Sequence, residues 1–133
     1  MIYIIAYVVV FLVFSAIDAA WLSMMGPAIY RPALGDILAT NLRIAPAIAF
    51  YAVYPIGVVA FAVLPALRAQ SPMTAATQAL LFGAIAYATY DLTNFATLRN
   101  WNLQITVLDI VYGAFASGVA ATAAYFAVRA FAR

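Results

Sequence analysis

Four long apolar stretches occupy most of this sequence, and each is long enough to cross a lipid bilayer as a helix. About 20 mostly apolar residues in a helix cross a bilayer core that is about 30 Å thick. The stretches cover about residues 2–24, 43–67, 73–96 and 103–128. None of them alternates strictly between apolar and polar residues, as a half-buried strand would. Since only helices and closed barrels satisfy the backbone hydrogen bonds in lipid, the sequence predicts four transmembrane helices.

The composition is typical of an integral membrane protein. Hydrophobic residues make up 69% of the 133 residues, charged residues make up 8%, and the mean hydropathy is +1.07, whereas soluble domains are about 45–50% apolar. We expect one all-α domain over residues 1–133, a four-helix transmembrane bundle with short loops. An even number of spans puts both termini on the same side of the membrane. The sequence has no basic soluble segment, which excludes nucleic acid as a partner.

The first stretch is expected to be a retained helix and not a cleaved signal peptide. A signal peptide begins with positive charge and has a short apolar core, whereas this chain opens with the uncharged segment MIYIIAYVVV. The six cationic residues are all arginines, and they divide evenly between the two predicted faces. The orientation of the bundle therefore stays open.

Cysteine and histidine are both absent. Their absence excludes disulfides, and it excludes haem or metal sites that use thiolate or imidazole ligands. A hard divalent cation such as Mg²⁺, Ca²⁺ or Mn²⁺ stays compatible with the sequence, because carboxylate and amide oxygens bind such ions. The sequence does not identify a cofactor beyond that.

Three aspartates lie inside the predicted spans. Asp18 is about six residues before the end of the first span, Asp91 about five before the end of the third, and Asp109 about six after the start of the fourth. The directions of the spans put all three near the same face, roughly 8–9 Å inside the bilayer boundary at 1.5 Å per residue. A carboxylate at that depth is costly, and such residues are by default candidates for a functional site.

We expect the three carboxylates to converge on a polar cavity that opens towards the first and third loops. They are the candidate catalytic residues, and together with Asn94 they are the candidate metal ligands. Arginines on the same face could offset the carboxylate charge or hold a phosphate. The alternative is that these polar residues only hold the helices together. The candidate ligand-binding residues are Asp18, Trp21, Arg31, Arg43, Tyr87, Asp91, Asn94, Arg99, Trp101 and Asp109.

Prolines are expected to interrupt the helices. Two X-Pro steps and a Gly-Asp pair predict a loop over about residues 25–42. Pro55 predicts a kink in the second span, because it frees the carbonyl of Tyr51. Tyr51 and Tyr54 of that span could direct their hydroxyl groups towards the acidic cluster.

Small and aromatic residues are assigned structural roles. Gly113, Ser117 and Ala121 recur every four positions in the fourth span, which predicts close packing against a neighbouring helix. Aromatic residues near one boundary favour an aromatic belt, with cavity lining as the alternative. These aromatic residues are Trp21, Tyr30 and Trp101.

Five segments of the chain resemble a known family. They read FSAIDAAWL, IYRPALGD, FAVLPAL, FGAIAYATYDLTNFATLRNW and TVLDIVYG. Together they are similar, over nearly the whole chain, to an uncharacterised family of small bacterial membrane proteins, domain of unknown function 2177. The resemblance implies a multi-pass protein of the bacterial cytoplasmic (inner) membrane with four helices, and it brings no established activity. Members of the family often have Trp-Pro in the third loop, where this chain has Trp101–Asn102.

Two classes of function are compatible with this site, and whether the protein is an enzyme stays open. In the first, the cavity binds, and could modify, a lipid headgroup or another amphiphile, with or without a divalent cation. In the second, the aspartates support proton-coupled or cation-coupled transport in a homo-oligomer. A further alternative is an accessory subunit of a larger membrane complex. The lipid bilayer is a partner in every case.

Overall fold

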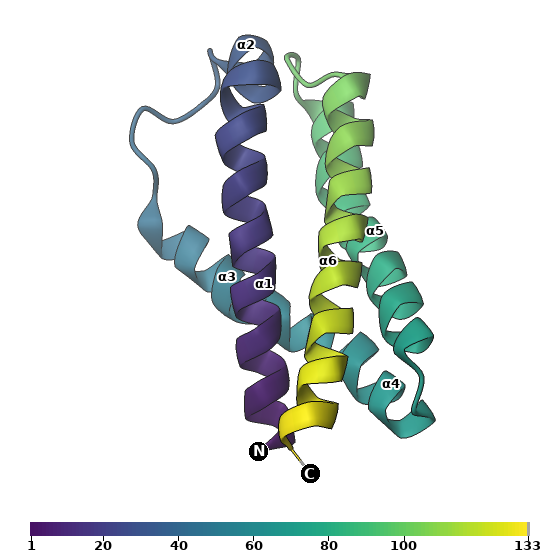
Figure 1. The fold of residues 1–133 in the computed structure, drawn as a ribbon. Coiled ribbons are helices and arrows are strands. Elements are labelled where there is room, and N and C mark those ends of the chain that lie inside the picture. Colours follow the sequence, from purple (N-terminus) through teal and green to yellow (C-terminus); the bar gives the residue numbers. More distant parts are fainter. Residues whose placement is uncertain (133) are drawn as a thin grey trace.

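The computed structural model describes residues 1–132, which form a bundle of long helices without a strand (Figure 1). Two of the elements, η1 and η2, are single π-helical turns that join α-helices end to end. The elements in chain order are α1 (Ile2–Met25), η1 (Gly26–Tyr30), α2 (Arg31–Leu34), α3 (Ile44–Val58), η2 (Val59–Val63), α4 (Leu64–Ala69), α5 (Pro72–Thr97) and α6 (Leu103–Phe131).

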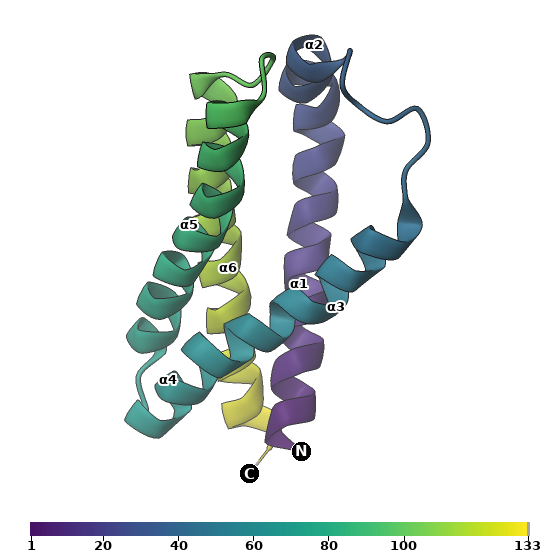
Figure 2. The ribbon, with the colours of Figure 1, turned by 180° about the vertical axis from the view of Figure 1, so that it is seen from behind.

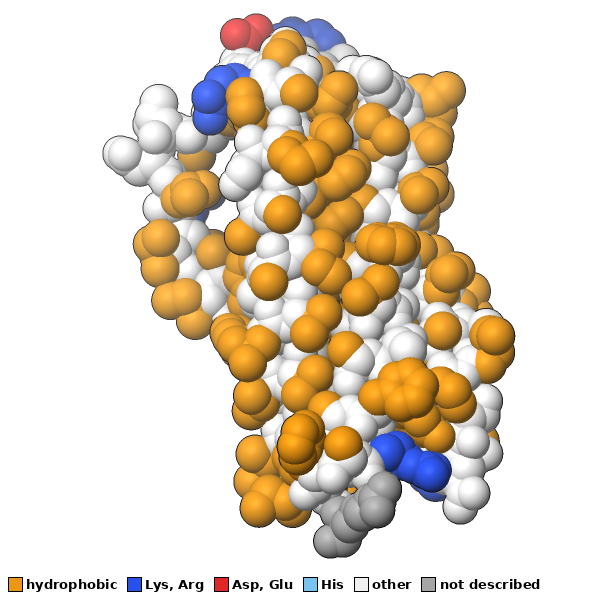
Figure 3. All heavy atoms as spheres, viewed as in Figure 1, with side chains coloured by type: hydrophobic (Ala, Val, Ile, Leu, Met, Phe, Trp, Pro, Cys, Tyr) orange, Lys and Arg blue, Asp and Glu red, His pale blue; other side chains and the backbone are white. Residues whose placement is uncertain are grey.

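Three helical units are long and apolar enough to cross a membrane. They are Ile2–Leu34, Ile44–Ala69 and Leu103–Phe131. α5 has 26 residues but carries more polar side chains, and it is not among the three. Figure 3 shows hydrophobic side chains along the face that α1 and α6 form, with charged side chains mainly towards its two ends. The molecule is thus an all-helical protein with the apolar surface of a membrane protein.

The first helix is longer than the sequence predicted. It runs through Pro27 and Pro32 to Leu34, whereas the two prolines predicted a loop from about residue 25. A proline interrupts the regular bonding of a helix, and the wider turn of a π-helix takes up such an interruption. In η1 the Arg31 N–H donates to the Gly26 carbonyl, five residues back. The helix ends only where Gly35 and Asp36 follow.

The second helical unit crosses the bundle obliquely. After the segment 35–43, α3 starts beside the loop-bearing half of α1, and α4 ends near the start of α5 (Figures 1 and 2). Pro55 lies inside α3, and the π-helical turn η2 follows one turn later. Because of this oblique path, the unit packs against α1 with one end and α5 with the other.

α5 and α6 pack side by side through small residues (Figures 1 and 2). Gly83 of α5 faces the carbonyl oxygen of Gly113 and the side chain of Ser117 so closely that a Cβ atom would lie 2.5 and 2.6 Å from their oxygens. Gly113 in turn makes room for the ring of Tyr87. Ala121 is fully buried on the same row. The close packing predicted from the small residues of the fourth span is confirmed.

The turn between α5 and α6 is held by a helix cap and by a buried aromatic side chain. The Asn102 side chain caps α6 by accepting a hydrogen bond from the Ile105 N–H (2.9 Å), and Trp101 beside it is buried. This turn and the α2–α3 connection lie at one end of the bundle, while the N-terminus, the end of α6 and the α4–α5 connection lie at the other (Figure 1). The terminal half contains a closed apolar core, in which Val10, Phe14 and Val63 are 0% exposed.

Candidate functional site

A cavity of about 720 Å³ lies in the half of the bundle that carries the α2–α3 and α5–α6 connections. Its walls come from α1, η1, α2, the segment after α2, α3, α5 and α6. Most of the wall is apolar or aromatic. Acidic residues line it from α1 and α6, and tyrosines line it from η1, α3, α5 and α6. Six of the ten candidate ligand-binding residues line it, namely Asp18, Trp21, Tyr87, Asn94, Trp101 and Asp109.

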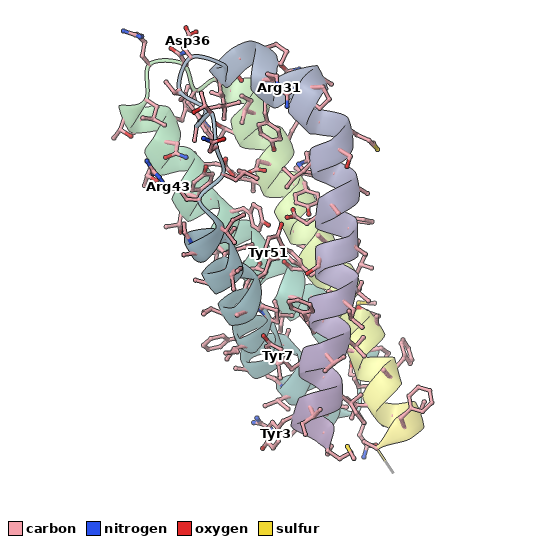
Figure 4. All side chains as sticks on the ribbon, turned by 90° about the vertical axis from the view of Figure 1, so that its left-hand side faces the viewer. Tyr3, Tyr7, Arg31, Asp36, Arg43 and Tyr51 are labelled. Carbon is pink, nitrogen blue, oxygen red and sulfur yellow. The ribbon has the colours of Figure 1, made fainter. Side chains whose placement is uncertain are left out.

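Asp18 of α1 is held by two tyrosines from other helices. The Tyr112 hydroxyl of α6 donates to Asp18 Oδ1 (2.6 Å), and the Tyr51 hydroxyl of α3 donates to Asp18 Oδ2. Figure 4 labels Tyr51 near the middle of the bundle. Asp18 is 7% exposed and Tyr112 is 6% exposed. Both carboxyl oxygens are therefore satisfied in a setting where an unpaired carboxylate would be costly.

Asp109 of α6 belongs to a second group of hydrogen bonds. The Tyr30 hydroxyl of η1 donates to Asp109 Oδ1 (2.7 Å), and the Trp21 indole N–H of α1 donates to the Tyr30 oxygen (3.1 Å). The Trp21 ring stacks on the Tyr112 ring with centroids 4.4 Å apart and planes 12° apart. This stacking joins the groups around Asp18 and Asp109 into one network across α1, η1, α3 and α6.

Asp91 of α5 lies behind the cavity wall and not on it. Its side chain is 0% exposed, and within residues 1–132 neither of its carboxyl oxygens has a hydrogen-bond partner. Its closest electrostatic neighbour is the carboxyl group of Asp109, which approaches it across the α5–α6 contact. Asp91 and Asp109 are thus an acidic pair with only one member on the cavity.

The three aspartates occupy two levels. Asp109 lies one helical turn before Tyr112, the residue that binds Asp18, so Asp18 is about one turn deeper than the Asp91–Asp109 pair. Asp18 also sits near the middle of the helical unit Ile2–Leu34, since that helix continues past the predicted loop boundary. The sequence had placed it close to the end of a shorter span.

The arginines that were expected to face the carboxylates lie elsewhere. Arg31, Arg43 and Arg99 are exposed, and none of them lines the cavity. Figure 4 places Arg31 on the helical end of the first unit and Arg43 where the segment 35–43 leads into α3. Within the described chain no ion pair joins these arginines to the buried aspartates. The partners of Asp18 and Asp109 are therefore tyrosine hydroxyl groups, where the sequence had suggested arginine side chains.

The acidic residues do not gather as metal ligands. Among residues 1–132 no three acidic side chains come close enough to hold one ion. Asp18 has both oxygens engaged by tyrosines, and Asn94 lines the same cavity. Ca²⁺ requires six to eight oxygen ligands and Mg²⁺ a near-octahedral set, so this arrangement favours recognition by charge and hydrogen bonding over chelation.

Sequence reasoning missed the role of Tyr30, which it assigned to an aromatic belt. It named Tyr51 as able to reach the acidic cluster. Tyr112 lies one turn from Asp109 on the same helix, yet it binds Asp18. Tyr54, also expected to reach that cluster, bonds with Ser117 at 2.7 Å. The chain has nine tyrosines, so composition alone could not single out the ones that meet a carboxylate.

Comparison with known proteins gives one match. The family described as "Predicted membrane protein (DUF2177)" matches residues 3–126, a range that includes every residue of the cavity. The resemblance inferred from the five sequence segments is thereby confirmed. Neither a curated protein nor a solved structure matches the chain.

Proposed function

The chain belongs to the DUF2177 family of predicted membrane proteins, and from that premise we propose that it crosses the bilayer four times and binds an amphiphile in the cavity beside Asp18 and Asp109. By amphiphile we mean a molecule with one polar end and one apolar end, such as a membrane lipid. The resemblance to a family of small bacterial membrane proteins supports a location in the cytoplasmic membrane of a bacterium. The cavity carries the proposal, because it joins a large apolar space to a polar end at bilayer depth.

The place of α5 in the bundle supports a fourth span. α5 has 26 residues, about 39 Å at 1.5 Å per residue, which exceeds the bilayer core of about 30 Å. It lies against α6 along its length (Figures 1 and 2), and α6 is long and apolar enough to span. The polar side chains that lower the hydropathy of α5 include Asp91 and Tyr87, which point into the protein. In this arrangement both ends of the chain lie on one side of the membrane.

The cavity has the size and the lining of a ligand site. Small-molecule sites measure about 300–1,000 Å³ and combine apolar walls with a few placed polar groups, and this cavity of about 720 Å³ has both. Its polar groups are already fixed before a ligand arrives, because Asp18 and Asp109 are held by tyrosines. Such preorganisation lowers the cost of binding.

The oblique path of α3 supplies a lateral entrance. Phe50 of α3, Tyr90 of α5 and Leu98 after α5 line the cavity and are 40%, 58% and 38% exposed. Figure 2 shows that α3 leaves the loop-bearing half of α5 uncovered. In a four-span protein this side faces lipid, so a molecule dissolved in the bilayer reaches the cavity without crossing water.

The accessory-subunit alternative receives less support from this fold. A lipid-exposed face of small residues on the fourth span would favour this alternative, because another membrane protein could pack against it. Gly113, Ser117 and Ala121 are instead buried inside the chain, where Gly113 and Ser117 pack against α5.

The test is native mass spectrometry of the protein purified from its own membrane, with a variant that fills the cavity. Ala86 lines the cavity, so Ala86→Phe should expel a bound amphiphile. Ala96→Phe is the matched control, because Ala96 is exposed on the same helix and does not line the cavity. We expect wild type and Ala96→Phe to retain the same lipid-sized ligand and Ala86→Phe to lose it. Equal retention by all three proteins, or none by wild type, would refute the proposal.

A further inference from the structure

We propose that the ligand of this cavity carries a positively charged, ammonium-type group, and that the Asp91–Asp109 pair is its binding site. The inference rests on the proposed function and deepens it by naming the class of ligand. It starts from a pair of acidic side chains in the protein interior that has no cationic partner within the described part of the chain.

The pair holds more acceptor capacity than the protein uses. Asp109 accepts one hydrogen bond from Tyr30, and the two oxygens of Asp91 accept none within residues 1–132. Buried acceptors without a donor cost about 1–3 kcal/mol, and charged ones cost more. A donor or a positive charge that reaches Asp109 from the cavity would therefore act on both carboxyl groups, since Asp91 lies directly behind.

Asp18 is not the cation site, although it also lines the cavity. Its two oxygens already accept hydrogen bonds from Tyr51 and Tyr112. Those tyrosines come from α3 and α6, so Asp18 ties three helices together at the cavity floor. Among the described residues, the buried carboxyl oxygens without a donor belong to the Asp91–Asp109 pair. This pair lies about one helical turn from Asp18, on the side of the loops.

The wall around the pair suits an organic cation. Among residues 1–132 no arginine lines the cavity, so no cationic side chain there repels a positive charge or pairs with a phosphate. Aromatic rings are concentrated instead, including Trp21, Tyr30, Tyr90 and Trp101. Aromatic faces attract ammonium groups, and aromatic cages are a known means of binding them.

A metal ion fits the same pair less well. Two carboxyl groups supply only part of the oxygen ligands that a divalent ion takes, so water would have to supply the rest, and no third acidic side chain joins them among the described residues. The apolar volume beyond the pair would also be unused by a bare ion. An ammonium group attached to an apolar body uses both parts of the cavity.

The chain offers an internal reporter for a binding test. Its two tryptophans, Trp21 and Trp101, both line the cavity, so tryptophan fluorescence reads this site without a label. The probe is dodecyltrimethylammonium, added below its own micelle concentration to protein in a neutral maltoside detergent. Dodecanol and dodecanoate, which share the chain length, test a neutral and an anionic head group.

We expect saturable binding of the ammonium probe and no competition from dodecanoate. Asp109→Asn and Asp91→Asn should each weaken binding by about tenfold or more, because each removes one of the two carboxyl groups that together hold the negative charge of the pair. Asp36→Asn is the matched control, since Asp36 is exposed on the loop and does not line the cavity. It should bind like wild type. The head-group series on wild type gives an answer even if a buried variant fails to fold.

Each contrary result has a definite meaning. If dodecanol binds as tightly as the ammonium probe and Ala86→Phe abolishes the binding of both, the cavity binds amphiphiles but does not select a positive charge. If both Asp→Asn variants fold and bind the probe as wild type does, the assignment to the pair is wrong. If Mg²⁺ displaces the probe from wild type but not from Asp109→Asn, the pair binds a metal ion and the inference fails. If no amphiphile binds wild type and none is retained from the membrane, the proposed function fails as well.

Discussion

The contact between α5 and α6 predicts that Gly83→Ala destabilises the protein while Gly118→Ala does not. A Cβ at Gly83 would lie 2.5 Å from the Gly113 carbonyl oxygen and 2.6 Å from Ser117 Oγ. Ordinary contacts between heavy atoms lie at about 3.5–4.0 Å, so the two helices would have to separate by roughly 1 Å. The nearest obstacle is backbone, which cannot rotate away as a flexible side chain can.

The expected magnitude follows from two opposing effects. Inserting a methyl group into a well-packed contact costs about 1–3 kcal/mol, and replacing glycine by alanine inside a helix returns about 0.5–1 kcal/mol. Gly83→Ala should therefore lose about 1–2 kcal/mol of unfolding free energy. A Cβ at Gly118 meets nothing closer than the Ala76 carbonyl oxygen at 3.5 Å, so Gly118→Ala should keep or gain stability.

Thermal unfolding in detergent, followed by circular dichroism, measures this difference. The two substitutions add the same methyl group to the same helix pair, so effects of detergent and of composition cancel between them. A lower midpoint for Gly83→Ala than for wild type, with Gly118→Ala at or above wild type, supports the packing described here. If Gly83→Ala is as stable as Gly118→Ala, the close approach of α5 and α6 is wrong.

Three further predictions use the same preparation. Tyr112→Phe removes a donor from the buried Asp18 and should lower the unfolding free energy by about 1–3 kcal/mol, whereas an unchanged midpoint would show that the hydrogen bond is not formed. Asn102→Ala removes the cap of α6 and should cost about 0.5–2 kcal/mol, measured in the same unfolding assay, and no loss would contradict the cap. The chain has no cysteine, so single cysteines introduced by Gln70→Cys and Asn100→Cys can be labelled in sealed vesicles with an impermeant thiol reagent. They should react from opposite sides of the membrane, and labelling from the same side would show that α5 does not span.

Part of the candidate site could be predicted from the sequence, because intramembrane acids are rare and costly. Asp18, Asp91 and Asp109 stand out in a chain with only four acidic residues, and helix direction places them near one face. The partners of these acids could not be predicted in the same way. Tyr30 meets Asp109 from 79 positions away in sequence, and Tyr112 meets Asp18 from 94 positions away. No helical periodicity connects residues so far apart.

The prolines show a second limit of sequence reasoning. Pro27 and Pro32 each predict a break, because each removes a backbone donor. Instead of breaking, the helix forms one π-helical turn and continues to Leu34. That local adjustment moves Asp18 towards the middle of a helix and carries Tyr30 to the place where it can bond Asp109. The choice between a break and a wider turn depends on packing around the segment, which the local sequence does not contain.

The sequence by itself determined that this chain forms helices in a bilayer, since long uncharged stretches in lipid satisfy their backbone hydrogen bonds in almost no other way. It also determined that the buried acids need partners. Only the tertiary structure decided that tyrosines and not arginines are those partners, that Asp91 stands behind Asp109 without one, and that α3 crosses obliquely to leave a cavity beside them. These outcomes depend on which helix faces meet, and that is set by packing between residues far apart in the chain.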